Sequence, residues 1–180
     1  SLFSGCGGSD LGATRAGVDI VFAIDKNKDA HLTYKAYVGL LAAPGAEVKH
    51  VDVSKLKTLP QCDVLIGCYP CQSFTMGGPR EPDADPDSKL FLEFHRCLEL
   101  CDAKFFVAEN VSGLMWLGKG KYLKEQLAAF TWAGRGYAVS YRLLDAKDYG
   151  VPASRKRVFL VGVRRDLGLY YWFPEPTHGP

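Results

Sequence analysis

The sequence has no long apolar run and little net charge. None of its apolar stretches approaches the ~18 residues that a membrane-spanning helix needs, and no basic segment followed by an apolar one opens the chain. Lysine and arginine exceed aspartate and glutamate by only two in 180 residues, an excess too small to announce a nucleic-acid partner by itself. No repeat or low-complexity tract is present. These absences favour an intracellular protein, cytoplasmic or, in a eukaryote, nuclear, with no membrane partner.

Cysteine is present, but it does not indicate a disulfide framework. At 180 residues and 47% hydrophobic composition, the chain can bury roughly 70% of its unfolded surface in one core, so it does not need disulfide bonds for stability. We therefore expect a single domain with reduced thiols. The six cysteines are Cys6, Cys62, Cys68, Cys71, Cys97 and Cys101.

Strands and helices alternate along the chain. This alternation predicts βαβ units and an α/β fold, with a mostly parallel sheet, helices on both faces and two final strands joined by residues 147–156. One helix is expected to end near Ala16. Three residues are few for a central strand, so we expect the natural chain to begin upstream of Ser1. Predicted strands cover 1–3, 18–25, 47–53, 62–68, 103–111, 137–146 and 157–166; the other predicted helices cover 28–41, 90–101 and 121–134.

Two segments carry more specific expectations. In the helix over 28–41, the spacing predicts one broad apolar face that contains Leu32, Tyr37, Leu40 and Leu41. Residues 75–89, TMGGPREPDADPDSK, are rich in glycine, proline and acids and predict a long loop. Loops of this length are usually functional lids or disordered, although an ordinary surface loop is the alternative.

A glycine-rich turn, FSGCGG, follows the first strand. Its glycines let the backbone approach a ligand and aim helix-start N–H groups at an anionic group, although many such turns serve only packing. Asp25 follows Gly5 by twenty residues and ends the next strand, where its carboxylate can accept hydrogen bonds from ribose hydroxyls. Asp52 ends the third strand and could address an adenine amino group. The turn and both acids predict an adenosine-containing ligand.

Cys71 lies in Pro70-Cys71-Gln72, directly after a predicted strand and at the ligand edge of the sheet. A zinc site would need four ligands, and the cysteine spacing is atypical of structural zinc. A redox C-x-x-C should open a helix, whereas Gln72 leads into the loop. For Cys68 we expect a small buried hydrophobe. For Cys71 the alternatives of ligand, core residue and nucleophile remain open from its spacing alone.

The order of the motifs resembles that of the DNA (cytosine-5) methyltransferases. FSGCGG, Asp25, PCQ at 70–72, ENV at 109–111 and RKR at 155–157 follow the family's order over essentially all 180 residues. The resemblance implies a Rossmann-like methyltransferase fold and S-adenosylmethionine as the cofactor. The residues implied to bind it are Phe3, Gly5, Cys6, Gly7, Asp25, Asp52, Pro70 and Leu90.

The same resemblance implies methyl transfer to C5 of a cytosine that is flipped out of double-stranded DNA. Because C5 is a poor nucleophile, a Cys71 thiolate would first add to C6. Glu109 would be the general acid near N3, with its pKa raised by burial. Asn110 would position Glu109 or the loop that holds Cys71. The remaining implied site residues are Arg155 and Arg157, for phosphate or cytosine O2, and Gln72, Ser73 and Thr75, for the substrate; no metal is implied.

The chain departs from the family pattern at three places. Tyr69 replaces a proline, a change expected to matter little, and Ala153 replaces a glutamine. The chain also stops at Pro180, before the family's target-recognition region and C-terminal motifs. We therefore expect 1–180 to be an incomplete catalytic, cofactor-binding domain with 75–89 as a mobile active-site loop. The chain would then be either truncated or one subunit of a split enzyme whose second polypeptide supplies the rest.

Other functions remain open from the sequence. A branch of the same family methylates cytosine in transfer RNA with the same cysteine and glutamate. The chain could also be a non-catalytic subunit that binds the cofactor or DNA. For the arginine pair at 155 and 157, the alternative is a basic strand edge that resists aggregation.

Overall fold

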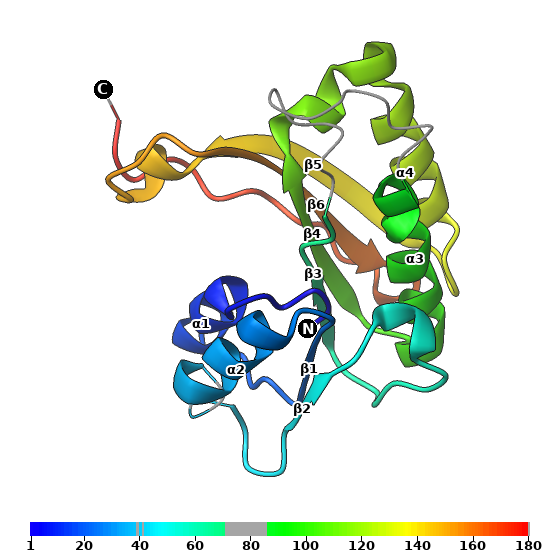
Figure 1. The fold of residues 1–180 in the computed structure, drawn as a ribbon. Helices are drawn as coiled ribbons and strands as arrows, with labels where there is room; N and C mark the ends of the chain where they lie inside the picture. The colour runs from blue at the N-terminus through cyan, green and yellow to red at the C-terminus, as the bar shows by residue number, and fades with distance from the viewer. Residues whose placement is uncertain (39, 41, 71–85, 180) are drawn as a thin grey trace.

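The computed structural model describes residues 1–38, 40, 42–70 and 86–179. Helices α1 and α2 lie on one side of the strands, and α3 and α4 lie on the other (Figure 1). The helices are α1 (Gly8–Arg15), α2 (Lys28–Tyr37), α3 (Leu90–Cys101) and α4 (Lys121–Thr131). The strands are β1 (Phe22–Asp25), β2 (Glu47–His50), β3 (Val64–Gly67), β4 (Phe105–Val111), β5 (Tyr137–Asp145) and β6 (Lys156–Arg164).

The strands form two groups that meet at Leu2. β1 pairs with β2 in parallel, and the second group has the order β3-β4-β6-β5. Within it β3 and β4 are parallel, whereas β6 runs antiparallel to both β4 and β5. Leu2 makes isolated parallel bridges to Ile24 in β1 and to Gly67 in β3. The predicted α/β class, with helices on both faces and an antiparallel final pair, is confirmed.

The strand predicted at residues 18–25 is shorter than expected. Strand pairing begins at Phe22, so residues 18–21 of the predicted strand lie outside β1. By contrast, α3 occupies the predicted range 90–101. Among the described helices none is long and apolar enough to cross a membrane.

The predicted apolar face of α2 is wrong. Leu32, Tyr37 and Leu40 are each more than half exposed, whereas Tyr34 is fully buried. Leu41, the fourth residue of that face, lies outside the described residues. The Tyr34 hydroxyl donates a 2.7 Å hydrogen bond to the carboxylate of Asp10, which is itself buried in α1. This polar contact between two helices fixes the rotation of α2 about its axis. The spacing of apolar residues along the helix does not reveal such a contact.

A cluster of aromatic rings forms the core between the β3-β4-β6-β5 sheet and the helices α3 and α4. Phe106 is fully buried at its centre, with ring centroids of Phe130 at 5.3 Å and of Tyr137 at 5.1 Å. Phe94 of α3 lies 5.8 Å from the same ring. Gly162 of β6 is the register partner of Phe106, so the ring lies over a position without a side chain.

The variant Gly162→Ala is expected to destabilise the fold by about 1–3 kcal/mol, because a Cβ atom there would lie 1.9 Å from Cε1 of Phe106. The neighbouring rings leave Phe106 no free space to move away. Gly12→Ala is the matched control, since its Cβ would meet nothing within 4 Å in α1. Thermal and urea unfolding should separate the two variants; equal stabilities would contradict the close contact.

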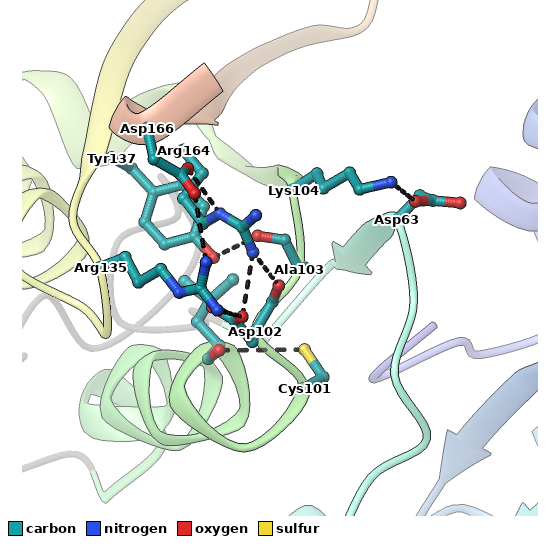
Figure 2. A network of polar contacts seen from close by, with 10 residues as sticks. Asp63, Cys101, Asp102, Ala103, Lys104, Arg135, Tyr137, Arg164 and Asp166 are labelled. Atoms are coloured by element: carbon teal, nitrogen blue, oxygen red, sulfur yellow. Dashed lines mark hydrogen bonds and ion pairs between the residues drawn. The ribbon is translucent and has the colours of Figure 1, made fainter. Parts of the chain in front are cut away.

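A polar network closes the end of the sheet where α3 stops (Figure 2). The Arg164 guanidinium donates to the Asp102 carbonyl at 2.6 Å and to the Asp166 carboxylate at 2.7 Å. Arg135 pairs with both of these aspartates, and Tyr137 donates to the Ala103 carbonyl at 2.7 Å. The hydrogen bond from Arg164 lowers the pKa of Asp166. The network ties the end of α3 to the end of β6, at the edge opposite the candidate site.

Candidate functional site

Polar residues gather where the strands end. Asp25 is the last residue of β1, and Asp52 follows β2 and begins a short 3-10 helix, Val53–Lys55. Cys68 and Pro70 follow β3, while Glu109 and Asn110 are among the last residues of β4. Because β1 to β4 are parallel through Leu2, these ends share one edge of the sheet, which is where open α/β sheets bind ligands.

A cavity of ≈300 Å³ opens at this edge. Six of the eight residues expected to bind the cofactor line it, whereas Cys6 and Gly7 do not. Cys6 is exposed. Gly7 has a φ of 92° and caps α1, and a Cβ there would meet Val38 at 2.6 Å, so its role in this structure is packing. The lining residues are Phe3, Gly5, Ile24, Asp25, Lys26, Val51, Asp52, Val53, Cys68, Pro70 and Leu90.

Both predicted acids are held by backbone N–H groups. One Asp25 oxygen accepts from Gly5 N at 2.8 Å, and the other accepts from Asn27 N at 2.7 Å. Asp25 therefore fixes the glycine turn, and its remaining lone pairs stay available to hydroxyl groups. Asp52 accepts from Ser54 N at 2.9 Å, and hydrogen bonds from Ser54 lower the pKa of this carboxyl. Both acids are positioned before any ligand arrives.

Glu109 forms an ion pair with Arg157 beside this edge. The Arg157 Nε lies 2.9 Å from Glu109 Oε1, and each side chain is less than one-quarter exposed. Val111 of β4 is the register partner of Arg157 in β6, which puts the two charged residues diagonally on one face. Burial raises the pKa of Glu109, and the positive charges of Arg157 and Arg155 oppose this increase.

Asn110 points to the opposite face from Glu109 and is buried. Its Nδ2 donates to the Tyr69 carbonyl at 3.4 Å, and its Oδ1 accepts from Val111 N at 2.8 Å. Tyr69 is also buried and donates from its hydroxyl to Gln126 Oε1 at 2.7 Å. The residue that replaces a proline is thus an anchor of the segment leading to Cys71, contrary to the expectation that it matters little.

Arg155 is held through its backbone. Its N–H donates to Asp145 Oδ1 at 2.9 Å, and Ser154 donates to the other oxygen of the same carboxylate at 2.9 Å. Asp145 at the end of β5 therefore fixes the start of β6, from which Arg155 and Arg157 extend. The sequence offered no signal for Asp145 beyond its place at a strand end.

Cys68 is a further residue of the site that was expected to be only a core residue. It lines the cavity, and the parallel register continues so that Cys68 lies beside Glu109, since Gly67 pairs with Ala108. Burial raises the pKa of the Cys68 thiol to about 11, with the Glu109 charge adding to the effect. This thiol is therefore protonated at neutral pH and is a poor nucleophile.

Several predicted site residues lie outside the described residues. These are Cys71, Gln72, Ser73 and Thr75, together with most of the expected active-site loop. The last four residues of that loop, Pro86–Lys89, form a 3-10 turn that leads into α3. Pro70 and Leu90, which flank the segment, both line the cavity.

The fold and the site define an α/β domain with a cavity lined by two carboxylates and a partly buried carboxylate–guanidinium pair at the same sheet edge. The family model for C-5 cytosine-specific DNA methylase matches residues 1–178. The chain belongs to this family, and the resemblance read from its motifs is confirmed.

Relatives of known name support the same assignment. The chain is 38% identical to type II methyltransferase M.BsuRI of Bacillus subtilis, over 99% of this chain and 46% of that protein. It is 40% identical to M.MthTI of Methanothermobacter thermautotrophicus, over 99% and 52%. It is 39% identical to M.AquIA of Picosynechococcus sp., over 100% and 76%. The chain thus spans about half the length of the first two relatives and three-quarters of the third.

Solved structures share the fold. A crystal structure assigned as a prophage-encoded DNA modification methyltransferase of E. coli matches with a TM-score of 0.78 and 29% identity, over 99% of this chain and 51% of that chain. The Dnmt2 methyltransferase of S. pombe matches with a TM-score of 0.62 and 28% identity, over 91% and 49%.

Proposed function

We propose that this chain carries the cofactor-binding and catalytic residues of an enzyme that transfers a methyl group from S-adenosylmethionine to C5 of cytosine in double-stranded DNA. One observation carries the proposal. The cavity lined by Asp25 and Asp52 and the Glu109–Arg157 pair lie at the same sheet edge, with Cys68 adjoining both. A ligand in the cavity would therefore lie close to a partly buried acid.

The residues of the cavity fit the proposed cofactor. Two carboxylates among apolar side chains suit a nucleoside, whose hydroxyl and amino groups donate hydrogen bonds. The volume of ≈300 Å³ lies at the lower end of the range for small-molecule sites. Asp25 would hold the ribose hydroxyls, and Asp52 would accept from the adenine amino group. When bound, S-adenosylmethionine supplies an electrophilic methyl group on its sulfur.

The chain's own residues would then activate the base. The Cys71 thiolate adds to cytosine C6, and Glu109 donates a proton at N3, so that negative charge does not accumulate on the ring. Arg157 holds the Glu109 carboxyl in place through the 2.9 Å contact. Asn110 fixes the Tyr69 carbonyl, two residues before Cys71, and so constrains where the nucleophile begins.

The choice of DNA over transfer RNA rests on the named relatives, which are type II methyltransferases. Double-stranded DNA is therefore the proposed partner. Since the chain spans about half of most of them, we propose that target recognition resides outside residues 1–180. It would be supplied by further chain or by a second polypeptide.

Trapping of a covalent protein–DNA adduct tests the proposal. The purified protein is incubated with adenosylmethionine and duplex DNA that contains 5-fluorocytosine, and adducts are resolved on a denaturing gel. Fluorine at C5 blocks the final elimination, so a covalent adduct that needs the cofactor and Cys71 is expected. Stable binding of adenosylmethionine and DNA without an adduct would reject the covalent mechanism and favour the non-catalytic alternative. An adduct with transfer RNA alone would reject the DNA substrate.

The variant Asp25→Asn is expected to weaken adenosylmethionine binding by ~1–3 kcal/mol, because a hydrogen bond to a charged acceptor is lost. Isothermal titration calorimetry measures this affinity directly. Asp29→Asn is the matched control, since Asp29 is exposed on α2 and does not line the cavity. If both variants bound adenosylmethionine with the same affinity, Asp25 would not be the residue that contacts the ribose.

A further inference from the structure

The segment that joins β5 to β6 leads into both arginines of the candidate site. Arg155 is its last residue, and Arg157 is the second residue of β6. Figure 1 shows this segment at the far end of the long β5-β6 hairpin. Because side chains alternate between the two faces of a strand, a shift of the β5-β6 pairing by one residue would turn Arg157 away from Glu109. The place of the arginines therefore depends on what fixes the pairing at this end of the hairpin.

Asp145, the last residue of β5, holds this end of the hairpin closed. It is buried, and its carboxylate accepts hydrogen bonds from Ser154 Oγ and from Arg155 N, each at 2.9 Å. The next residue, Ala146, donates from its backbone N–H to the Arg155 carbonyl at 3.1 Å. Both polar backbone groups of Arg155 are thus bound at the point where the last register pair, Asp145 with Lys156, ends the hairpin ladder.

The middle of the same segment is held separately. The Asp148 carbonyl accepts hydrogen bonds from Thr177 N at 3.0 Å and from His178 N at 2.9 Å. The C-terminal segment therefore keeps the middle of the turn in place. Loss of the hydrogen bonds to Asp145 would release mainly the end of the turn, where Arg155 lies.

The two arginines differ in how they are held. The Arg157 side chain pairs with Glu109 at 2.9 Å. The hydrogen bonds to Asp145 and Ala146 fix only the backbone of Arg155, so its guanidinium can bind a phosphate or a carbonyl oxygen of the substrate. Burial raises the pKa of Glu109, and the charges of both arginines oppose this rise. Their place therefore also affects how readily Glu109 releases its proton.

We propose that Asp145 is a positioning residue for methyl transfer, which sets the place of Arg155 and Arg157 relative to Glu109 through its hydrogen bonds at the end of β5. This inference rests on the proposed function, because it concerns the arginine pair of that site. Asp145 does not line the proposed cofactor cavity, so it should affect the transfer step and not the affinity for adenosylmethionine. Its partners are a hydroxyl and a backbone N–H, which are both neutral, so it acts by hydrogen-bond geometry and not by charge.

The proposal is tested on the purified protein with two readouts. Asp145→Ala is expected to lower the single-turnover rate constant for methyl transfer by ~10–10²-fold, because misplaced substrate-binding groups slow catalysis steeply, and to leave adenosylmethionine affinity unchanged. The pKa of Glu109 should rise further in this variant, since two positive charges move away from the carboxylate. NMR titration of the glutamate carboxyl carbons measures this pKa, with Glu109→Gln to assign the signal.

Asp145→Asn should restore both values. Its amide oxygen can still accept from Arg155 N, and its amide nitrogen can donate to Ser154 Oγ. Asp148→Ala is the matched control, because it removes a carboxylate from the same turn but keeps the carbonyl that binds the C-terminal segment. Neither readout should change in it. If Asp145→Ala does not fold, Ser154→Ala removes one of the two hydrogen bonds and should move both readouts in the same direction by a smaller amount.

Two outcomes would overturn the proposal. The first is an unchanged rate constant and an unchanged Glu109 pKa in folded Asp145→Ala, or in Ser154→Ala where the alanine variant at Asp145 does not fold. The second is an Asp145→Asn variant that behaves like Asp145→Ala, because the charge of Asp145 would then be the property that matters. The pKa of Glu109 is measured without substrate, so this result is obtained independently of whether the protein transfers a methyl group.

Discussion

Replacing Glu109 with glutamine is expected to lower the rate constant for methyl transfer by ~10²–10⁴-fold, the usual contribution of a general acid. Glutamine keeps the size and a hydrogen-bonding side chain but has no proton to give. Asp25 and Asp52 are untouched, so the affinity for adenosylmethionine should remain. Single-turnover kinetics with saturating DNA, combined with cofactor titration, would separate the two effects.

The pH profile distinguishes an acid from a merely structural carboxylate. Burial raises the pKa of Glu109, so its protonated form persists to higher pH than for an exposed glutamate. Transfer by the unmodified protein should therefore decline as pH rises through this pKa, and the glutamine variant should lack that decline. The same shift means that protonation of Glu109 favours the folded state at low pH, a contribution that is lost as pH rises through the raised pKa.

Glu93→Gln is the control for this experiment. Glu93 also pairs with an arginine, Arg96, at 2.7 Å, but it lies on α3 and does not line the cavity. Its replacement should leave both the rate constant and the pH profile unchanged. If Glu109→Gln behaved in the same way, Glu109 would only hold Arg157, and the proton donor would have to be sought elsewhere.

The variant Phe106→Ala is expected to destabilise the domain by about 3–5 kcal/mol, the range for removing a fully buried aromatic ring. Phe106 contacts the rings of Phe94, Phe130 and Tyr137, so its loss leaves a cavity bounded by three elements that cannot all move inward. Chemical denaturation measures the change. Tyr141→Ala on β5 is the control, because this ring is 46% exposed and should matter by less than ~0.5 kcal/mol.

A double-mutant cycle sharpens the same prediction. Gly162→Ala is harmful because its Cβ would collide with the Phe106 ring. In the Phe106→Ala background the ring is absent, and the added methyl group would fill part of the cavity. The two changes should therefore be non-additive, with the second less destabilising than it is alone. Additive free energies would show that the ring does not lie over Gly162.

The parts of the fold that the sequence predicted correctly are those set by local patterns. The range of α3 follows from its apolar spacing, and the strand-helix alternation predicts the α/β class. The rotation of α2 could not be predicted, because it depends on the hydrogen bond from Tyr34 to a buried acid on another helix. Residues 18–21 have strand-like composition, but β1 pairs with β2 only from Phe22 onward.

A similar division holds for the site. Asp25 and Asp52 could be anticipated because one ends a strand and the other comes soon after one, and the ends of parallel strands share one edge. The pairing of Glu109 with Arg157 depends on the antiparallel register of β4 and β6, which the spacing of 47 intervening residues does not encode. The sequence predicts Cys68 to be a core residue, because a strand pattern does not reveal a cavity at the end of the strand.

The junction at Leu2 has a consequence for ligand binding. Among the described residues, Leu2 alone has bridges to both strand groups. Asp25 and Asp52 belong to the β1-β2 group, while Cys68 and Pro70 follow β3 of the other group, and all four line one cavity. A ligand that touches both sides would link the two strand groups directly, in addition to the core cluster that they already share. Occupancy should then appear as slower amide exchange across β1 and β2.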